Sequence, residues 1–129
     1  WLPLAGNLVA VVEELILRYS PDWHLGGCTG LYPERFVQLG EAGYQDIESF
    51  SFDVQVPYSH AAWRGRIRAS AGVGGSLPPA EVARFDAEHR ELLQEGFPQD
   101  PLAVPHRVFA ILARPPRVAI DSLGPAARR

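Results

Sequence analysis

The pattern of apolar and polar residues predicts four helices. In each one the apolar residues lie three or four positions apart, as one face of a helix requires. Residues suited to a helix N-terminus precede or open these segments. The predicted helices are residues 7–19 with Asn7 as N-cap, a short helix from Pro33 to about Gly40, a helix from the N-cap Ser59 to the glycine-rich segment 72–79, and a helix that begins at Pro79 and carries Val82, Phe85, His89, Leu92 and Leu93 on one side.

Two further segments have the pattern of strands. Residues 50–58 alternate apolar and polar side chains, so one face of this strand is apolar and must be covered by helices or by another sheet. Residues 104–113 are rich in residues that favour strands. Because two strands alone rarely form a stable sheet, we expect them to pair with each other and to offer their edges to another copy or to a missing portion. The element order indicates an α/β chain.

Composition narrows the class of protein. The 129 residues form one unit of ordinary domain size, and the net charge of −3 argues against a general nucleic-acid or membrane-surface binder. With Cys28 as the one cysteine, the chain can form neither an internal disulfide nor a cysteine-based zinc site, which predicts a cytoplasmic protein. The apolar run 8–17 is too short for a membrane span and carries Glu13 and Glu14. Trp1 as the first residue and the lack of methionine indicate a piece of a longer protein, and residues 115–129 are expected to be a loosely ordered tail.

Seven segments are similar to one known family. They are WLPLAGN at 1–7, ELI at 14–16, PDWHLGG at 21–27, GLYP at 30–33, AGYQDIESFSFD at 42–53, SHAAWRGRIRASAGVG at 59–74 and PHRVFAILARP at 105–115. Together they resemble the C-terminal part of bacterial class I S-adenosylmethionine-dependent methyltransferases of the methyltransferase-11-like, small-molecule kind. The resemblance implies the C-terminal portion of a Rossmann-like fold, from the end of its fifth strand onward, with helices packed on an antiparallel strand pair.

The resemblance also implies which part of the enzyme is missing. The cofactor-binding half of such enzymes precedes the matched region, so S-adenosylmethionine would bind the full-length parent and not this fragment, which is expected to be inactive alone. The glycine-rich LGGCTG at 25–30 lacks a preceding apolar strand, a leading acidic residue and a following helix start. The implied partner is a small-molecule methyl acceptor, without nucleic acid or membrane, and exposed sheet edges could support a homo-oligomer. The alternative is a non-catalytic ligand-binding or oligomerisation domain.

The candidate site residues lie in two places. In the glycine-rich loop, Trp23 and His24 are candidates for substrate contact, and Tyr58 and His60 follow the first strand, where ligands of α/β folds bind. His60 is the candidate general base, because the dipole at a helix start disfavours its protonated form. A surface or capping role is the alternative for His60.

The helix after Ser59 supplies three more candidates. Arg64 and Arg68 lie four residues apart and could clamp a substrate carboxylate or phosphate; alternatively they pair with surface acids such as Asp53 or Glu48. Trp63 faces the core or forms a wall of the substrate site. His106 is expected to be a structural hydrogen-bonding residue. The four histidines have no metal-ligand spacing, no G-x-S-x-G elbow occurs, and Cys28 lacks the basic surroundings of a reactive thiol.

Overall fold

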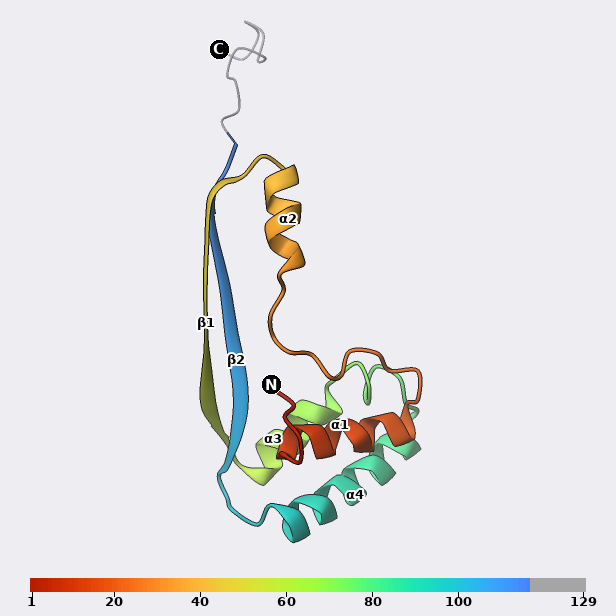
Figure 1. Ribbon diagram of the computed structural model, residues 1–129. Coiled ribbons are helices and arrows are strands. Elements are labelled where there is room, and N and C mark those ends of the chain that lie inside the picture. The colour runs from red at the N-terminus through yellow and green to blue at the C-terminus, as the bar shows by residue number, and fades with distance from the viewer. Residues whose placement is uncertain (117–129) are drawn as a thin grey trace, which may run out of the picture. The chain divides into compact units, whose positions relative to one another are not determined.

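The computed structural model describes residues 1–116 and shows a mixed α/β chain with an antiparallel strand pair (Figure 1). In these residues the elements are α1 (Leu8–Tyr19), α2 (Glu34–Glu41), β1 (Gln45–Tyr58), α3 (His60–Arg68), α4 (Pro79–Gly96) and β2 (Leu102–Arg114). The predicted class, element order and pairing of the two strands are confirmed. Most of the predicted tail, residues 117–129, lies outside the described residues.

Local signals explain where the helices begin. The side chain of Asn7 accepts a hydrogen bond from the backbone of Ala10 at 2.9 Å, and Ser59 Oγ accepts one from Ala62 at 3.1 Å. Both contacts satisfy N–H groups that a helix start leaves without a partner in the helix. At α4 no side chain caps the helix, and Pro79 occupies its first turn instead. The predicted starts of α1, α3 and α4 are therefore confirmed to the residue or nearly so.

Strand β1 is longer than its alternation predicts. It begins at Gln45 rather than Phe50, and its first residues include Asp46, whose φ is +50°. Cross-strand ion pairs join Asp53 to Arg107 and Asp46 to Arg114. The two pairs are seven residues apart on each strand, so the antiparallel register is the same at both. Pairing with β2 therefore extends β1 through residues that lack apolar alternation.

The described chain divides into two compact units. Unit 1 contains residues 1–31 and 51–108, and unit 2 contains residues 32–50 with those from 109 onward. Both strands contribute residues to both units. The length of the chain does not anticipate this division, and the expectation that residues 1–129 form a single unit stays a prediction.

The hydrophobic core belongs to unit 1. It is formed by one face of each of α1, α3 and α4 together with the start of β2, which Figure 1 shows grouped in space. Its fully buried members include Leu15, Ile16, Trp63, Phe85 and Val104. Between α1 and α4, Tyr19 packs edge-on against Phe85, and its hydroxyl donates to Glu88 at 2.9 Å. The three helices thus share one core, as the apolar faces of the predicted helices require.

The apolar face of the strand pair is covered over only part of its length in unit 1. At one end, Tyr58 of β1 and Leu102 and Val104 of β2 pack into the core. Further along the same face, Val54 and Val108 are more than a third exposed. Helices therefore cover the apolar face where β1 leads into α3, as expected. They do not cover it beside Val54.

Unit 2 has little buried surface among its described residues. The ring of Phe109 contacts Tyr32 and Phe36 with centroids 5.9 and 6.3 Å apart, yet no residue of α2 is buried. Leu112 is exposed as well. This unit therefore rests on a few aromatic contacts and on the pairing of its two strand segments.

His89 is a polar side chain inside the core. It is 0% exposed, it packs against Phe85 with ring centroids 5.7 Å apart, and neither ring nitrogen has a hydrogen-bond partner among the described residues. Burial lowers the pKa of His89 from 6.5 to about 4, and the nearby guanidinium groups of Arg64 and Arg68 act in the same direction. The folded protein therefore holds this imidazole neutral.

The neutral state of His89 predicts a stability that depends on pH. Because its pKa is about 4 in the folded chain and near 6.5 in the unfolded chain, the unfolded chain binds the extra proton between these values. The free energy of unfolding should therefore fall as pH falls from 6.5 toward 4, by up to about 1.4 kcal/mol per pH unit. Urea unfolding between pH 7.5 and 5 measures this slope. In His89→Leu the slope should be nearly absent, and an equal slope in both proteins would contradict the assignment.

Candidate functional site

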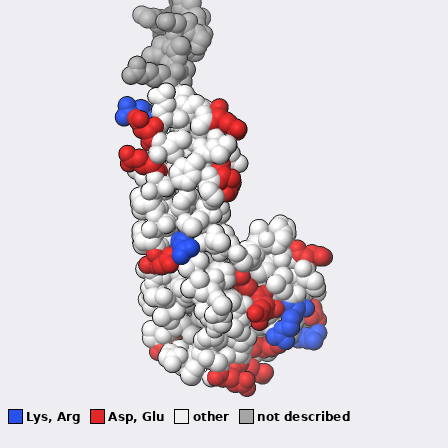
Figure 2. Space-filling model, viewed as in Figure 1, with Lys and Arg blue, Asp and Glu red and all other residues white. Residues whose placement is uncertain are grey.

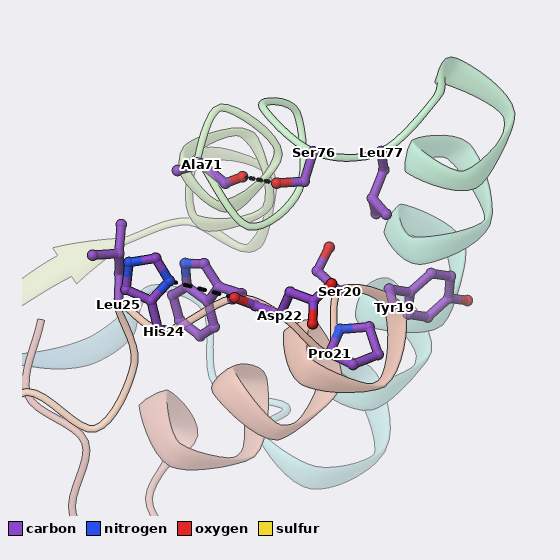
Figure 3. Close-up of a pocket in the computed structure, with 10 residues that line it drawn as sticks. Tyr19, Ser20, Pro21, Asp22, His24, Leu25, Ala71, Ser76 and Leu77 are labelled. Atoms are coloured by element: carbon purple, nitrogen blue, oxygen red, sulfur yellow. Dashed lines mark hydrogen bonds between the residues drawn. The ribbon is translucent and has the colours of Figure 1, made fainter.

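The loop between α1 and α2 borders two hollows of unit 1. The first hollow, drawn in Figure 3, has a volume of about 500 Å³ and lies between residues 19–25 and the segment after α3 that includes Ala71, Ser76 and Leu77. Its polar lining residues include Asp22, His24 and Ser76. Ser76 Oγ donates to the carbonyl oxygen of Ala71 at 2.5 Å, which fixes the upper wall of the hollow in this view.

The second hollow has a volume of about 450 Å³ and lies between residues 3–5, α1 and residues 23–27. Its walls are largely apolar, with Pro3, Leu4 and Leu17 among them, and its charged lining residues are Glu13 and Glu14. Both volumes are in the range of small-molecule sites. Trp23 and His24, two residues that the sequence singles out for substrate contact, line both hollows; their contact with a substrate stays a prediction.

Two glycines make room for the indole of Trp23. A Cβ atom on Gly26 would lie 2.7 Å from the Trp23 ring, and one on Gly72 would lie 3.1 Å from the ring and 2.6 Å from a methyl group of Ile16. Ser20 links the same segments, because its hydroxyl donates to the carbonyl oxygen of Gly72 at 2.7 Å. The polar, aperiodic loop is therefore packed against unit 1 by its tryptophan.

His24 is the exposed member of the pair. Its Nδ1 lies 3.4 Å from the carbonyl oxygen of Asp22, a long contact in which the ring nitrogen is the donor (Figure 3). In this tautomer Nε2 carries the lone pair and is the nitrogen that can accept a proton or a hydrogen bond from a ligand.

Glu13 also lines the second hollow, although the sequence pattern marks it only as a charge in an apolar run. It is 7% exposed, and its carboxylate accepts hydrogen bonds from Trp1 Nε1 and from the backbone of Gly27, both at 2.8 Å. On the indole of Trp1 lies the guanidinium of Arg66, 5.2 Å from the ring centroid. The spacing of Glu13 in the sequence indicates its burial. It lies four residues after Val9 and three before Ile16, on the buried side of α1.

The contact with Glu13 bears on cofactor binding. A glycine-rich loop holds an anion with its backbone N–H groups, but here the N–H of Gly27 already donates to a carboxylate. The N–H of Gly27 is therefore engaged by a carboxylate of the chain itself, and the absence of a cofactor site in this segment stays a prediction.

Arg64 and Arg68 both bind Asp86 of α4. Arg64 donates to both carboxylate oxygens through Nε and Nη2, and Arg68 Nη1 lies 2.6 Å from Oδ1. The pair of Arg64 and Asp86 is largely buried, with side-chain exposures of 20% and 19%, whereas Arg68 is 39% exposed. These hydrogen bonds lower the pKa of Asp86 and raise that of Arg64, although burial alone acts against both shifts.

Arg64 and Arg68 therefore pair with an acid, which was the alternative to a substrate clamp. The acid is Asp86 rather than Asp53 or Glu48. The previously named Asp53 binds Arg107 instead, with distances of 2.7 and 2.9 Å. No sequence pattern links Arg64 to Asp86, because the contact depends on how α3 packs on α4. A substrate clamp by Arg64 and Arg68 stays a prediction, and it would require them to leave or share Asp86.

Trp63 and Tyr58 form an aromatic group with Trp1 and His106. Trp63 is fully buried between the rings of Trp1 and Tyr58, at centroid distances of 5.6 and 5.4 Å. Tyr58 stacks on His106, whose Nδ1 is 3.0 Å from the carbonyl oxygen of Val104. The core position of Trp63 and the structural role of His106 agree with expectation, and substrate contact by Tyr58 or Trp63 stays a prediction.

His60 is fixed at the start of α3. Its Nε2 donates to the carbonyl oxygen of Gln99 at 2.9 Å, which leaves Nδ1 as the acceptor of the neutral ring. It does not line either hollow. The structure thus separates the predicted site residues into Trp23 and His24 beside the hollows, and Tyr58, His60, Trp63, Arg64 and Arg68 at α3.

Within residues 1–116 the structure offers neither a metal site nor a membrane-spanning helix. There, no group of three or more His, Cys, Asp or Glu side chains could hold a metal ion. No helix in this part of the chain is long and apolar enough to cross a bilayer. On the face drawn in Figure 2, blue atoms occur in small groups next to red ones and form no extended basic surface.

Comparison with protein-family models, with curated proteins and with solved structures gives no match to this chain.

The contacts of Asp86 predict that it stabilises unit 1. Asp86→Asn removes the counter-charge of two arginines, so we expect a loss of about 2 kcal/mol in the free energy of unfolding, between the effects typical of exposed and of buried ion pairs. Urea unfolding measures it. The matched control is Glu81→Gln, which removes an exposed i,i+3 pair with Arg84 and should cost at most about 0.5 kcal/mol. Equal losses in the two variants would contradict the role given to Asp86.

The packing of Trp23 predicts that Gly72 tolerates no side chain. Gly72→Ala places a methyl group against both Ile16 and the indole, so we expect destabilisation of about 1–3 kcal/mol and a changed tryptophan fluorescence spectrum. As a control, Gly96→Ala adds a methyl group at the end of α4 with nothing within 4 Å. It should be neutral or slightly stabilising. A neutral Gly72→Ala variant would show that Trp23 is not held in this position.

Proposed function

We propose that this chain is the C-terminal, acceptor-side portion of a class I S-adenosylmethionine-dependent methyltransferase that acts on a small molecule. The observation that carries the proposal is a backbone contact beside β2. The N–H of Leu2 donates to the carbonyl oxygen of Pro105 at 2.7 Å, so Leu2 contacts the backbone of β2 at this position. In the proposed fold, β1 and β2 are the sixth and seventh strands, and the fifth strand would end at Leu2.

The partly covered strand pair supports the same arrangement. A sheet in a Rossmann-like fold is covered by helices on both faces, and its strands have neighbours on both edges. Here Val54 and Val108 are exposed on an apolar face, and the described sheet has two strands. A neighbouring sheet portion with its own helices would supply both the missing strand contacts and the missing cover.

The chain's own residues support an acceptor-side role rather than a cofactor-side role. The hollows beside Trp23 and His24 have the size of small-molecule sites, whereas the glycine-rich loop uses its N–H at Gly27 to bind Glu13. We therefore place S-adenosylmethionine in the portion of the parent that precedes this chain. This chain would bind and orient the acceptor and exclude water from it.

His60 is the proposed proton acceptor of this portion. The bond from Nε2 to Gln99 fixes the ring and leaves the Nδ1 lone pair available, as a general base requires. Acting on the acceptor, it would take a proton at Nδ1 and pass it to solvent. This role and the substrate contacts of Tyr58, Arg64 and Arg68 depend on residues of the parent completing the site.

A second candidate is a ligand-binding domain without catalysis. The observation that favours it is that one compact unit of this chain, unit 1, supplies the lining residues of both hollows. Such a domain would bind its ligand without any preceding portion, and it would not require S-adenosylmethionine.

Calorimetry distinguishes the two candidates. We expect no heat of binding when S-adenosylmethionine is added to the 129-residue chain, and clear binding when it is added to the protein extended by the sequence encoded before Trp1. Methyl transfer to a small molecule should likewise require the extended protein. Binding by the 129-residue chain would show that the cofactor site has been misplaced. If the extended protein does not bind the cofactor, the methyltransferase proposal is wrong.

A further inference from the structure

The second hollow has apolar walls that are partly open to solvent. Leu4 and Leu17 line it and are 53% and 42% exposed, and Pro3, Ala5 and Ala10 complete the apolar lining. A volume of about 450 Å³ accommodates a ring or a short alkyl chain with one polar group. A ligand that covered the two leucines would gain from the removal of apolar surface from water.

The charged groups of this hollow all have the same sign. Glu13 and Glu14 are its ionisable acids, and no arginine is among its lining residues. In the described part of the chain, Glu13 forms no ion pair; its donors there include the neutral N–H groups of Trp1 and Gly27. The N-terminal ammonium of Trp1 acts on Glu13 from outside the lining of the hollow. A cation entering the hollow would still be attracted by the two carboxylates, because no positive group is among the lining residues.

We propose that the second hollow binds a small apolar amine in its protonated form. The ammonium group would lie toward Glu13 and Glu14, and the apolar part would cover Leu4 and Leu17. An organic anion is disfavoured by the two carboxylates, and a neutral apolar molecule would further desolvate Glu13 without pairing its charge. His24 lies at the same hollow and, in its neutral form, can accept a hydrogen bond from the amine.

The class of the methyl acceptor follows if the proposed function holds. The acceptor would then be an amine, held by the segment that follows Leu2 and by α1. Its ammonium group would have to lose a proton before the nitrogen attacks the methyl group of the donor, and because His60 does not line this hollow, Nε2 of the neutral His24 would take that proton. The binding inference itself requires only the residues of the second hollow, all of which belong to unit 1.

Three matched probes test the inference: 2-phenylethylamine, 2-phenylethanol and 3-phenylpropionate. They share a phenyl ring and differ in charge, and calorimetry at pH 7.5 measures each against the 129-residue chain. We expect the amine to bind at least tenfold more tightly than the alcohol, with no detectable binding of the carboxylate. The preference for the amine should shrink at high salt, because ions screen the carboxylates. An alcohol that binds as tightly as the amine, or an amine that does not bind, would overturn the proposal.

Two variants locate the site and test the role of charge. Glu14→Gln changes an exposed residue and should weaken amine binding by about three- to tenfold while alcohol binding stays the same. Its matched control, Glu91→Gln on the exposed surface of α4, should change neither. Leu17→Ala should weaken amine and alcohol binding by a similar factor, because it removes part of the apolar wall. An equal effect of the two glutamate variants would place the amine elsewhere.

The same probes separate failure of this inference from failure of the proposed function. An extended protein that binds S-adenosylmethionine but not the amine would leave the methyltransferase proposal intact and refute the amine. If the protein binds the amine and the extended protein does not bind S-adenosylmethionine, the amine inference holds and the methyltransferase proposal is wrong. This result would favour the ligand-binding domain.

Discussion

A two-stranded sheet cannot cover its own apolar face, and this constraint determines how unit 1 is built. The helices α1, α3 and α4 cover the end of the strand pair that carries Tyr58, Leu102 and Val104. They do not extend over Val54 and Val108, which share the same face and are exposed. The N–H of Leu2 binds the carbonyl oxygen of Pro105, which is one backbone contact on β2. The uncovered face and this contact are the physical basis of the proposed parent fold.

The contact between α3 and α4 shows why a cluster of arginines need not be a binding site. Asp86 accepts hydrogen bonds from both Arg64 and Arg68, and the fully buried His89 lies one turn further along α4. Burial is the main cause of the lowered pKa of His89; the charge of Asp86 opposes it and those of Arg64 and Arg68 add to it. The simplest role of these arginines is to fix α3 on α4. Because His60 is the first residue of α3, this contact also helps to fix the position of His60.

The sequence predicts those features that depend on neighbouring residues. Asn7 and Ser59 cap helices because a cap needs only the next three residues, and the buried positions of Trp63 and His89 follow from helical periodicity. Features that depend on distant segments were missed. The partner of Arg64 is twenty-two residues away on another helix, and β1 begins at Gln45 because of its pairing with β2 rather than because of alternation. The hollows beside His24 likewise need separate segments to meet, two for the first and three for the second, which no local pattern specifies.

Glu13 connects the fold to the candidate site more directly than any residue chosen from the sequence. From the buried side of α1 it binds Trp1 in the first segment and Gly27 in the glycine-rich loop, so one carboxylate holds both walls of the second hollow. The hydrogen bonds that set this geometry leave a negative charge next to apolar surface. An uncharged residue could pack on α1 at lower desolvation cost, but it would neither tie the two segments together nor attract a cation. The burial of this acid is therefore better explained by the site that it shapes than by the stability of the helix that carries it.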